Sequence, residues 1–179
     1  MNATIYLSIF LYFLLNGLSN IFSQFFNFLF SFFKFIFYII NKFFPFVANF
    51  TNGCFDILHE GHIYSLSQAA QTADFLIVGI NSDASVKRLK GETRPINNQQ
   101  SRSILLASLC IVDAVVVFDE DTPLELITSL LPNVLVKGGD YTLAQIVGAS
   151  EVINNGGEVI INPILQGFST TNIIEKMKQ

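Results

Sequence analysis

Hydrophobic and polar residues follow two different patterns on either side of residue 46. Upstream, the chain carries no charge from Met1 to Phe33, and Lys34 and Lys42 are the only charges before Pro45. Downstream, short apolar runs alternate with segments of helical periodicity, as in an ordinary globular protein. We therefore expect a hydrophobic, Phe-rich helical segment over residues 1–45 and one globular domain over residues 46–179.

The downstream pattern predicts a parallel α/β fold. Apolar runs of strand length occupy residues 46–51, 75–80, 114–118, 134–137 and 158–161. Helical patterns cover residues 63–73, a short segment from Ala84, residues 99–110, 122–131 and 170–178, and a polar, mobile loop is expected over 87–98. Strands that alternate with helices predict a Rossmann-like, doubly wound, parallel five-stranded sheet.

In such a sheet a ligand binds at the carboxyl ends of the strands, where the strand order reverses. Four segments follow strands in a way that brings them to this edge: residues 52–62, 81–90, 137–141 and 167–172. The sequence therefore predicts a single site built from these segments.

The upstream segment has two interpretations, which the sequence leaves open. As one straight helix, its uncharged run would be about 50 Å long, more than a bilayer core of about 30 Å, so a break and one span over residues 21–40 are expected. Lys34 and Lys42 would then keep the globular part cytoplasmic, at the inner face of the membrane. Alternatively, this mixture of Phe, Ile, Asn, Lys and Leu is what AT-rich DNA yields when translation is assigned to a wrong start.

Charge and cysteine content narrow the possible functions. The globular part carries eight basic and fourteen acidic residues without a Lys/Arg cluster, which argues against a nucleic-acid partner. Cys54 and Cys110 are too few for a disulfide framework. No base adjoins Cys54, so a packing role is favoured over that of a nucleophile.

Both histidines of the chain lie in the sequence His59-Glu60-Gly61-His62. The amide groups at a helix start attract phosphate, and imidazoles placed there can stabilise the charge that grows on a phosphorus under attack. Gly61 lets the backbone approach a ligand. Zinc is the competing interpretation, but it needs three or four protein ligands and only two histidines are available. We assign no metal ligand.

The surrounding sequence, TNGCFDILHEGH over residues 51–62, resembles the nucleotidyltransferases with an HxGH signature, the cytidylyltransferase-like superfamily. It is most similar to the adenylyltransferase domain of bifunctional heptose 7-phosphate kinase/heptose 1-phosphate adenylyltransferases. The similarity continues in NSDASVKRLKG (81–91), TRPIN (93–97), EDTP (120–123), VLVKGGDY (134–141) and STTNII (169–174). It covers roughly residues 47–178.

This resemblance implies transfer of AMP from ATP to heptose 1-phosphate, giving ADP-heptose for a cell-surface glycan such as the lipopolysaccharide core, and pyrophosphate. Mg²⁺ would be held mainly by the phosphates. The implied catalytic residues are His59, His62 and Lys90. Asp56 and Asp83 would bind sugar or ribose hydroxyls, although Asp83 also suits a helix cap. The implied nucleotide-binding residues are Thr51, Asn52, Gly53, Phe55, Gly61, Arg102, Lys137, Gly138, Gly139, Asp140, Tyr141, Ser169, Thr170 and Thr171.

Two features depart from that pattern. The kinase half that often precedes this domain is not in the chain, so a separate heptose kinase and a phosphatase are expected in the pathway. Phe168 stands where a small residue such as cysteine is expected, and it would narrow the pocket. A homo-oligomer is also expected.

Two other functions compete with this one. A glycerol-3-phosphate-type cytidylyltransferase would use the same HxGH chemistry with CTP. A membrane-tethered, non-catalytic nucleotide-binding module is the alternative from another class, and the intact His59, His62, Lys90 and Ser169 count against it.

Overall fold

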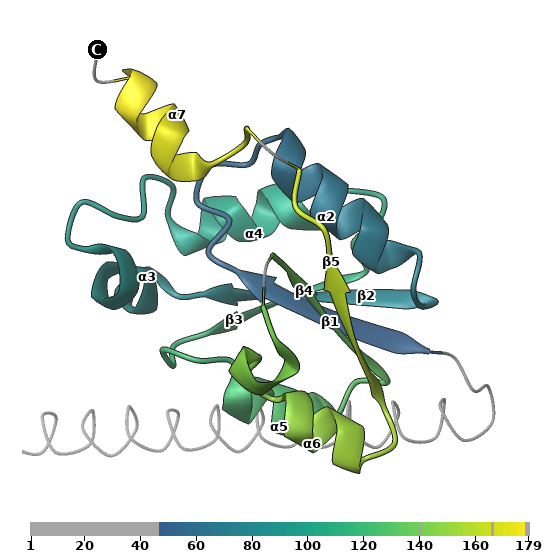
Figure 1. Ribbon diagram of the computed structural model, residues 1–179. Coiled ribbons are helices and arrows are strands. Elements are labelled where there is room, and N and C mark those ends of the chain that lie inside the picture. Colours follow the sequence, from purple (N-terminus) through teal and green to yellow (C-terminus); the bar gives the residue numbers. More distant parts are fainter. Residues whose placement is uncertain (1–46, 140, 166, 178–179) are drawn as a thin grey trace, which may run out of the picture. The chain divides into compact units, whose positions relative to one another are not determined.

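The computed structural model describes residues 47–139, 141–165 and 167–177, so the hydrophobic N-terminal segment and both interpretations of it lie outside the described residues. Within these ranges five parallel strands form one sheet in the order β3-β2-β1-β4-β5 (Figure 1). The strands are β1 (Ala48–Gly53), β2 (Phe75–Asn81), β3 (Ala114–Phe118), β4 (Val134–Gly138) and β5 (Glu158–Asn162). The predicted doubly wound sheet is confirmed.

Helices cover both faces of the sheet. α2 (Glu60–Ala70) and α4 (Gln99–Ala107) pack on one face, and α5 (Leu124–Leu130) and α6 (Ala149–Asn154) pack on the other (Figure 1). The remaining helices are α3 (Asp83–Lys90), a 3-10 turn η1 (Leu143–Gln145) and α7 (Thr170–Met177). In the part of the chain that the structure describes, no helix has the length and apolar character needed to cross a bilayer.

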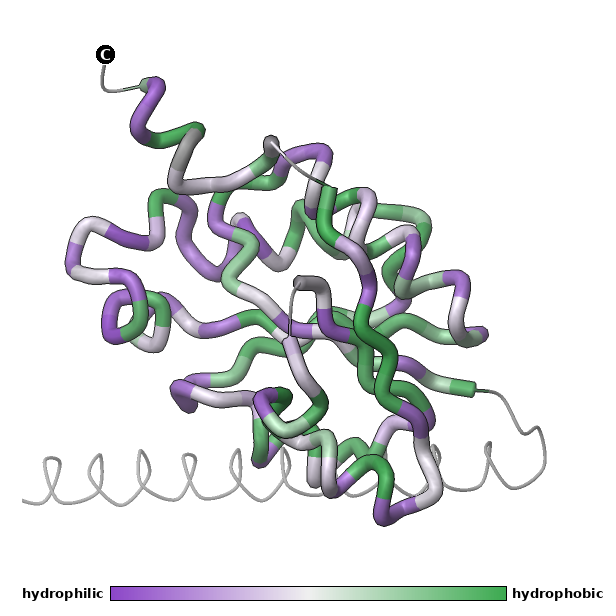
Figure 2. The backbone as a smooth tube through the Cα atoms, in the orientation of Figure 1, coloured by the Kyte–Doolittle hydropathy of each residue, from purple (hydrophilic) through white to green (hydrophobic). Residues whose placement is uncertain are grey.

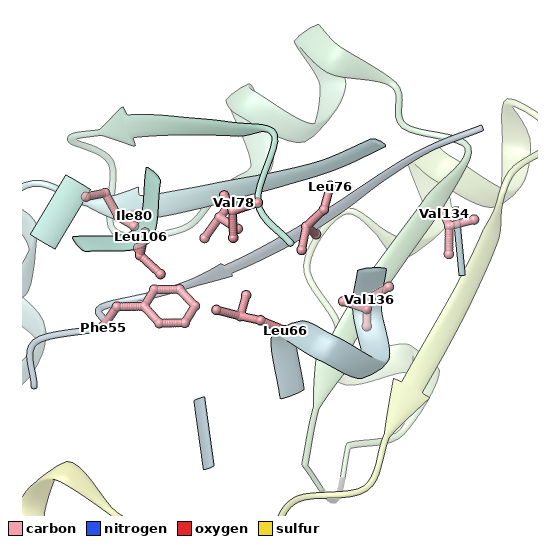
Figure 3. Packing of buried hydrophobic residues seen from close by; sticks show 10 residues of the cluster. Phe55, Leu66, Leu76, Val78, Ile80, Leu106, Val134 and Val136 are labelled. Atoms are coloured by element: carbon pink, nitrogen blue, oxygen red, sulfur yellow. The ribbon is translucent and has the colours of Figure 1, made fainter. Parts of the chain in front are cut away.

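The apolar runs form strands because both faces of the sheet are buried. Side chains alternate between the faces: Leu76, Val78 and Ile80 of β2 join the cluster beneath α2 and α4, whereas Ile77 joins the cluster beneath α5 and α6. Figure 3 shows the first cluster, with the Phe55 ring among its aliphatic side chains. Figure 2 shows the hydrophobic colour concentrated in the strands and hydrophilic residues in the loop that follows α3.

Several predicted boundaries were wrong. α2 starts at Glu60, three residues before the predicted start, so the histidine sequence itself forms its beginning. The segment predicted as a mobile loop over 87–98 supplies the last turn of α3, and its second half is hydrogen-bonded to the rest of the protein. η1 and α6 were not predicted, since elements of three and six residues are too short to show a helical period.

Gly79 offers a test of this packing, because its missing side chain makes room for Phe50. A Cβ at Gly79 would lie 2.6 Å from Phe50 Cζ, and Phe50 is fully buried. Gly79→Ala should therefore lower the free energy of unfolding by about 1–3 kcal/mol in urea denaturation. Adding Phe50→Leu should restore part of that loss by removing the ring. Unchanged unfolding of Gly79→Ala would show that the sheet absorbs the methyl group.

Candidate active site

A cavity of about 390 Å³ opens at the carboxyl ends of β1 and β4. These two strands are neighbours at the point where the strand order reverses, which is where parallel sheets bind ligands. The first turns of α2 and the segment leading into α7 complete its walls. The lining residues are Thr51, Asn52, Gly53, Phe55, His59, Gly61, His62, Ser65, Leu66, Lys137, Gly138, Tyr141, Ile164, Leu165, Phe168, Ser169 and Thr170.

The two histidines lie against each other at the start of α2. His59 is the N-cap residue, in extended conformation, and the His62 amide donates to the His59 carbonyl at 2.9 Å. Their rings stack with centroids 3.8 Å apart and planes 19° from parallel. The Phe55 ring lies 5.1 Å from His62 on the core side of the pair. Both imidazoles therefore face the cavity as one unit.

Burial keeps this pair uncharged. Burial, and to a lesser extent the neighbouring His59, lowers the pKa of His62 to about 4, and the Ile57 backbone acts in the opposite direction. Burial also lowers the pKa of His59. At neutral pH each ring is therefore a neutral imidazole, which carries one N–H that can donate to a phosphate oxygen.

Gly61 is required by the packing around the histidines. A Cβ at this position would lie 2.9 Å from the Phe168 Cβ and 3.2 Å from the ring of His59. From the sequence, we expected Gly61 to let the backbone come close to a ligand. The structure shows that protein side chains occupy the space next to it.

A positive charge also lines the cavity, at the end of β4. The Lys137 ammonium donates to Asn52 Oδ1 at 3.2 Å and lies 5.9 Å from the centre of the Tyr141 ring. Burial lowers the pKa of Lys137, which Cys54 partly offsets. A half-buried ammonium that faces a cavity favours an anionic ligand. The negative charge of the ligand replaces the stabilisation that the ammonium loses when burial removes water from it.

Ser169 and Thr170 line the same cavity where α7 begins. The hydroxyl and amide groups of a helix start suit the oxygens of a phosphate. The histidine pair, Lys137 and the Ser-Thr start of α7 are far apart in the sequence. The structure places all three around one cavity. Thr171 is exposed and is not among the residues that line it.

Two predicted binding residues, Asp56 and Arg102, are instead buried in the protein framework. Asp56 is ion-paired with Arg94 and accepts hydrogen bonds from the Ile96 and Asn97 amides at 2.7 and 2.9 Å. The fully buried Arg102 guanidinium donates to Asn97 O, Cys54 O and Asp83 Oδ1. Because their polar groups are already used in these bonds, neither residue lines the cavity.

Asp83 lies away from the histidines. Together with the cap residue Ser82 it borders a separate, open hollow of about 670 Å³ beside β3 and α4. Of the four segments expected to form one site, residues 81–90 are therefore not part of the histidine cavity. Lys90 is exposed at the end of α3, outside the cavity lining, and Gly139 adjoins the lining with φ of 127°. Asp140 lies outside the described residues.

Cys54 lies next to Arg102, whose guanidinium donates to the Cys54 carbonyl at 2.7 Å. Burial raises the pKa of its thiol, and the charges of Lys90, Arg102 and Arg94 act in the opposite direction. A raised pKa keeps the thiol protonated at neutral pH, which supports the packing role over a nucleophilic one.

Sequence reasoning missed four lining residues: Ser65, Leu66, Ile164 and Leu165. Ser65 follows His62 by one helical turn, so helical spacing alone would have placed it on the same face. Ile164 and Leu165 follow β5 in an irregular segment, where no periodic signal exists.

Comparison with known proteins agrees with this geometry. The family model described as cytidylyltransferase-like matches residues 50–176, from Phe50 in β1 to Lys176 in α7. The chain belongs to the cytidylyltransferase-like family. The prediction from the TNGCFDILHEGH sequence is thereby confirmed.

The relatives of this cytidylyltransferase-like chain include proteins named bifunctional protein HldE. The one from Nitrobacter winogradskyi is 61% identical over 127 residues, 71% of this chain and 26% of that protein. The one from Caulobacter vibrioides is 58% identical over 130 residues, 73% of this chain and 27% of that protein. The chain thus spans about a quarter of the length of these curated relatives.

Solved structures show the same fold. A lipopolysaccharide core biosynthesis protein from Thermoplasma volcanium has a TM-score of 0.55 and 28% sequence identity, and the match covers 67% of this chain and 97% of that one. Pantothenate synthetase from Thermus thermophilus has a TM-score of 0.51 at 17% identity, covering 71% of this chain and 61% of that one. The second likeness concerns the fold alone.

The buried Asp56–Arg94 pair should contribute strongly to stability. Asp56→Asn places an amide donor against other donors and leaves the half-buried Arg94 without its counter-charge, so unfolding in urea should become easier by about 3 kcal/mol. Asp121→Asn is the matched control, because it breaks the exposed Arg88–Asp121 pair and should cost less than about 1 kcal/mol. Equal effects of the two variants would contradict the framework role of Asp56.

Proposed function

We propose that this chain transfers an adenylyl group from ATP to a sugar 1-phosphate, D-glycero-β-D-manno-heptose 1-phosphate, giving ADP-heptose and pyrophosphate. Membership of the cytidylyltransferase-like family supports nucleotidyl transfer. The choice of ATP and heptose rests on the resemblance of residues 47–178 to heptose 1-phosphate adenylyltransferase domains and on the matches to bifunctional HldE proteins.

One observation carries the proposal: the stacked His59–His62 pair and the start of α7 face one cavity of about 390 Å³. The phosphate oxygens of a bound triphosphate would be contacted by the two imidazoles, by the start of α7 and by the Lys137 ammonium. Neutral imidazoles, an ammonium group and the amides of a helix start are all hydrogen-bond donors to an anion. Among the described residues that line the cavity, none is a carboxylate.

The proposed step is a direct displacement. A phosphate oxygen of the sugar phosphate attacks the α-phosphorus of ATP, the bond from that phosphorus to the β-phosphate bridging oxygen breaks, and pyrophosphate leaves. His59 and His62 donate hydrogen bonds to oxygens on the α-phosphorus, where negative charge grows in the transition state. No covalent enzyme intermediate is required.

Mg²⁺ would enter with the triphosphate and neutralise part of its charge. In the ranges described, no group of three or more His, Cys, Asp or Glu side chains could hold a metal ion. The side chains around the cavity are hydrogen-bond donors that suit phosphate oxygens, so the phosphates themselves would hold the Mg²⁺ ion. We assign it no protein ligand.

The remaining expectations belong to the same proposal. The reaction would take place in the cytoplasm, where ATP is available, and a separate heptose kinase and phosphatase would supply the substrate. We also propose that the chain acts as a homo-oligomer. Anchoring through residues 1–45, and the division of the chain at residue 46, remain predictions.

The substrate assignment is tested by pyrophosphate release from the full-length chain with Mg²⁺. ATP with heptose 1-phosphate should give turnover, and CTP with glycerol 3-phosphate should not. Turnover with the second pair alone would replace the proposal by the glycerol-3-phosphate-type cytidylyltransferase. Binding of ATP without turnover of either pair would favour the non-catalytic nucleotide-binding module.

The role of the histidines is tested by His62→Ala. Loss of a donor to the reacting phosphate should lower kcat by about 10²–10³-fold, as for oxyanion donors elsewhere. Gln71→Ala, at the exposed far end of α2, is the control and should keep the wild-type rate. A His62→Ala protein that is folded and fully active would remove His62 from the mechanism.

A further inference from the structure

Four rings form a continuous row along one wall of the cavity. The Phe55 ring contacts His62 at 5.1 Å between centroids, His62 stacks on His59 at 3.8 Å, and the Phe168 ring lies 6.3 Å beyond His59 with its plane 27° from that of the imidazole. The row joins three separate parts of the chain: the exit of β1, the start of α2 and the segment before α7. The two histidines occupy its middle.

The inner end of the row is fixed by the hydrophobic core. Phe55 is 7% exposed and packs in the cluster that contains Leu66 and Ile80 (Figure 3). Its backbone has a positive φ of 48°, which is unusual for a residue with a side chain. His62 therefore rests on a ring that the core holds in place.

The outer end is different, because Phe168 is 40% exposed and comes from a loop. Gly61 allows it to lie close to the α2 backbone, since a Cβ there would be 2.9 Å from the Phe168 Cβ. The Nδ1 atom of His59 is buried and makes no hydrogen bond to another described residue. Beyond its own backbone, the contacts that orient the imidazole of His59 are thus the stacking on His62 and the packing against Phe168.

We propose that Phe168 is a positioning residue that closes the outer end of the row and holds His59 stacked on His62, facing the cavity. A small residue at this position would leave one face of the His59 ring open and free to turn toward solvent. The consequence for catalysis rests on the proposed function, because it concerns the geometry of His59 at the α-phosphorus. The structural claim itself does not depend on the substrate.

Titration of the histidines gives a direct readout. The chain contains two histidines, so the Cε1–H region of a proton NMR spectrum holds one signal from each. The other titratable groups that line the cavity are Lys137 at the end of β4 and Tyr141 after it, while the adjacent Glu60 on α2 is exposed. None of these is altered by substitution of Phe168, so a shift reports on the ring itself.

In Phe168→Ala the face of His59 becomes hydrated. Because burial holds the pKa of His59 below its ordinary value of 6.5, that pKa should rise toward 6.5, and the His62 pKa, set mainly by deeper burial, should move less. Phe168→Tyr keeps the ring and should titrate like the wild type. Leu105→Ala, at a residue that is 48% exposed and outside the cavity lining, is the control for loss of surface apolar area.

Kinetics separate positioning from a general loss of structure. If the proposed reaction is confirmed, Phe168→Ala should lower kcat by roughly tenfold with a smaller change in the KM for ATP, because a misplaced catalytic group costs rate more than binding. Phe168→Tyr should recover the rate, and Phe168→Leu, which fills space without a flat ring, should recover only part of it. Far-UV circular dichroism verifies that each variant is folded.

The two claims can fail separately. Absence of turnover in the wild type would overturn the proposed function, while the NMR titration would still decide the position of His59. A His59 titration in Phe168→Ala that matches the wild type would overturn the positioning role. So would an equal loss of kcat in Phe168→Tyr, because that variant keeps the ring. Should Phe168→Ala not fold, the Phe168→Leu and Phe168→Tyr pair gives the same comparison.

Discussion

The first turn of α2 can lie this close to the loop before α7 only because residue 61 has no side chain. At Gly61 the ring of His59 and the Cβ of Phe168 lie so close to the backbone that any Cβ would displace one of them. The stacked histidines, and the wall of the cavity that they form, follow from this close approach. The glycine of the HxGH sequence thus has a packing reason that holds before any ligand is bound.

Charge is divided between the binding space and its support. Around the cavity the groups are neutral imidazoles, one ammonium and the start of a helix, all suited to donate to an anion. Two carboxylates lie outside the cavity lining: Asp56, after β1, pairs with Arg94 of the loop before α4, and Asp83 of α3 pairs with Arg102 of α4. This separation matters because a carboxylate inside the cavity would repel a triphosphate.

The parallel sheet explains why residues so distant in sequence meet. β1 and β4 are adjacent although residues 54–133 separate them, and their carboxyl ends lie side by side (Figure 1). Asn52 at the end of β1 and Lys137 at the end of β4 are joined by a hydrogen bond across this point. In this chain, which belongs to the cytidylyltransferase-like family, the His59-Glu60-Gly61-His62 sequence follows the end of β1 and lies at the same edge of the sheet.

The sequence by itself determined the strands, their parallel direction and the segments that bear the histidines and the Ser-Thr start of α7, because apolar runs, turn residues and a contiguous motif are local signals. Only the tertiary structure decided which charged residues face the ligand space. Asp56, Asp83 and Arg102 look like binding residues in the sequence, but their partners are 19 to 48 positions away, and local pattern does not report burial among such partners. The packing of Phe168 against His59 could not be predicted from local pattern either, because it joins a loop to the start of a helix more than 100 residues earlier.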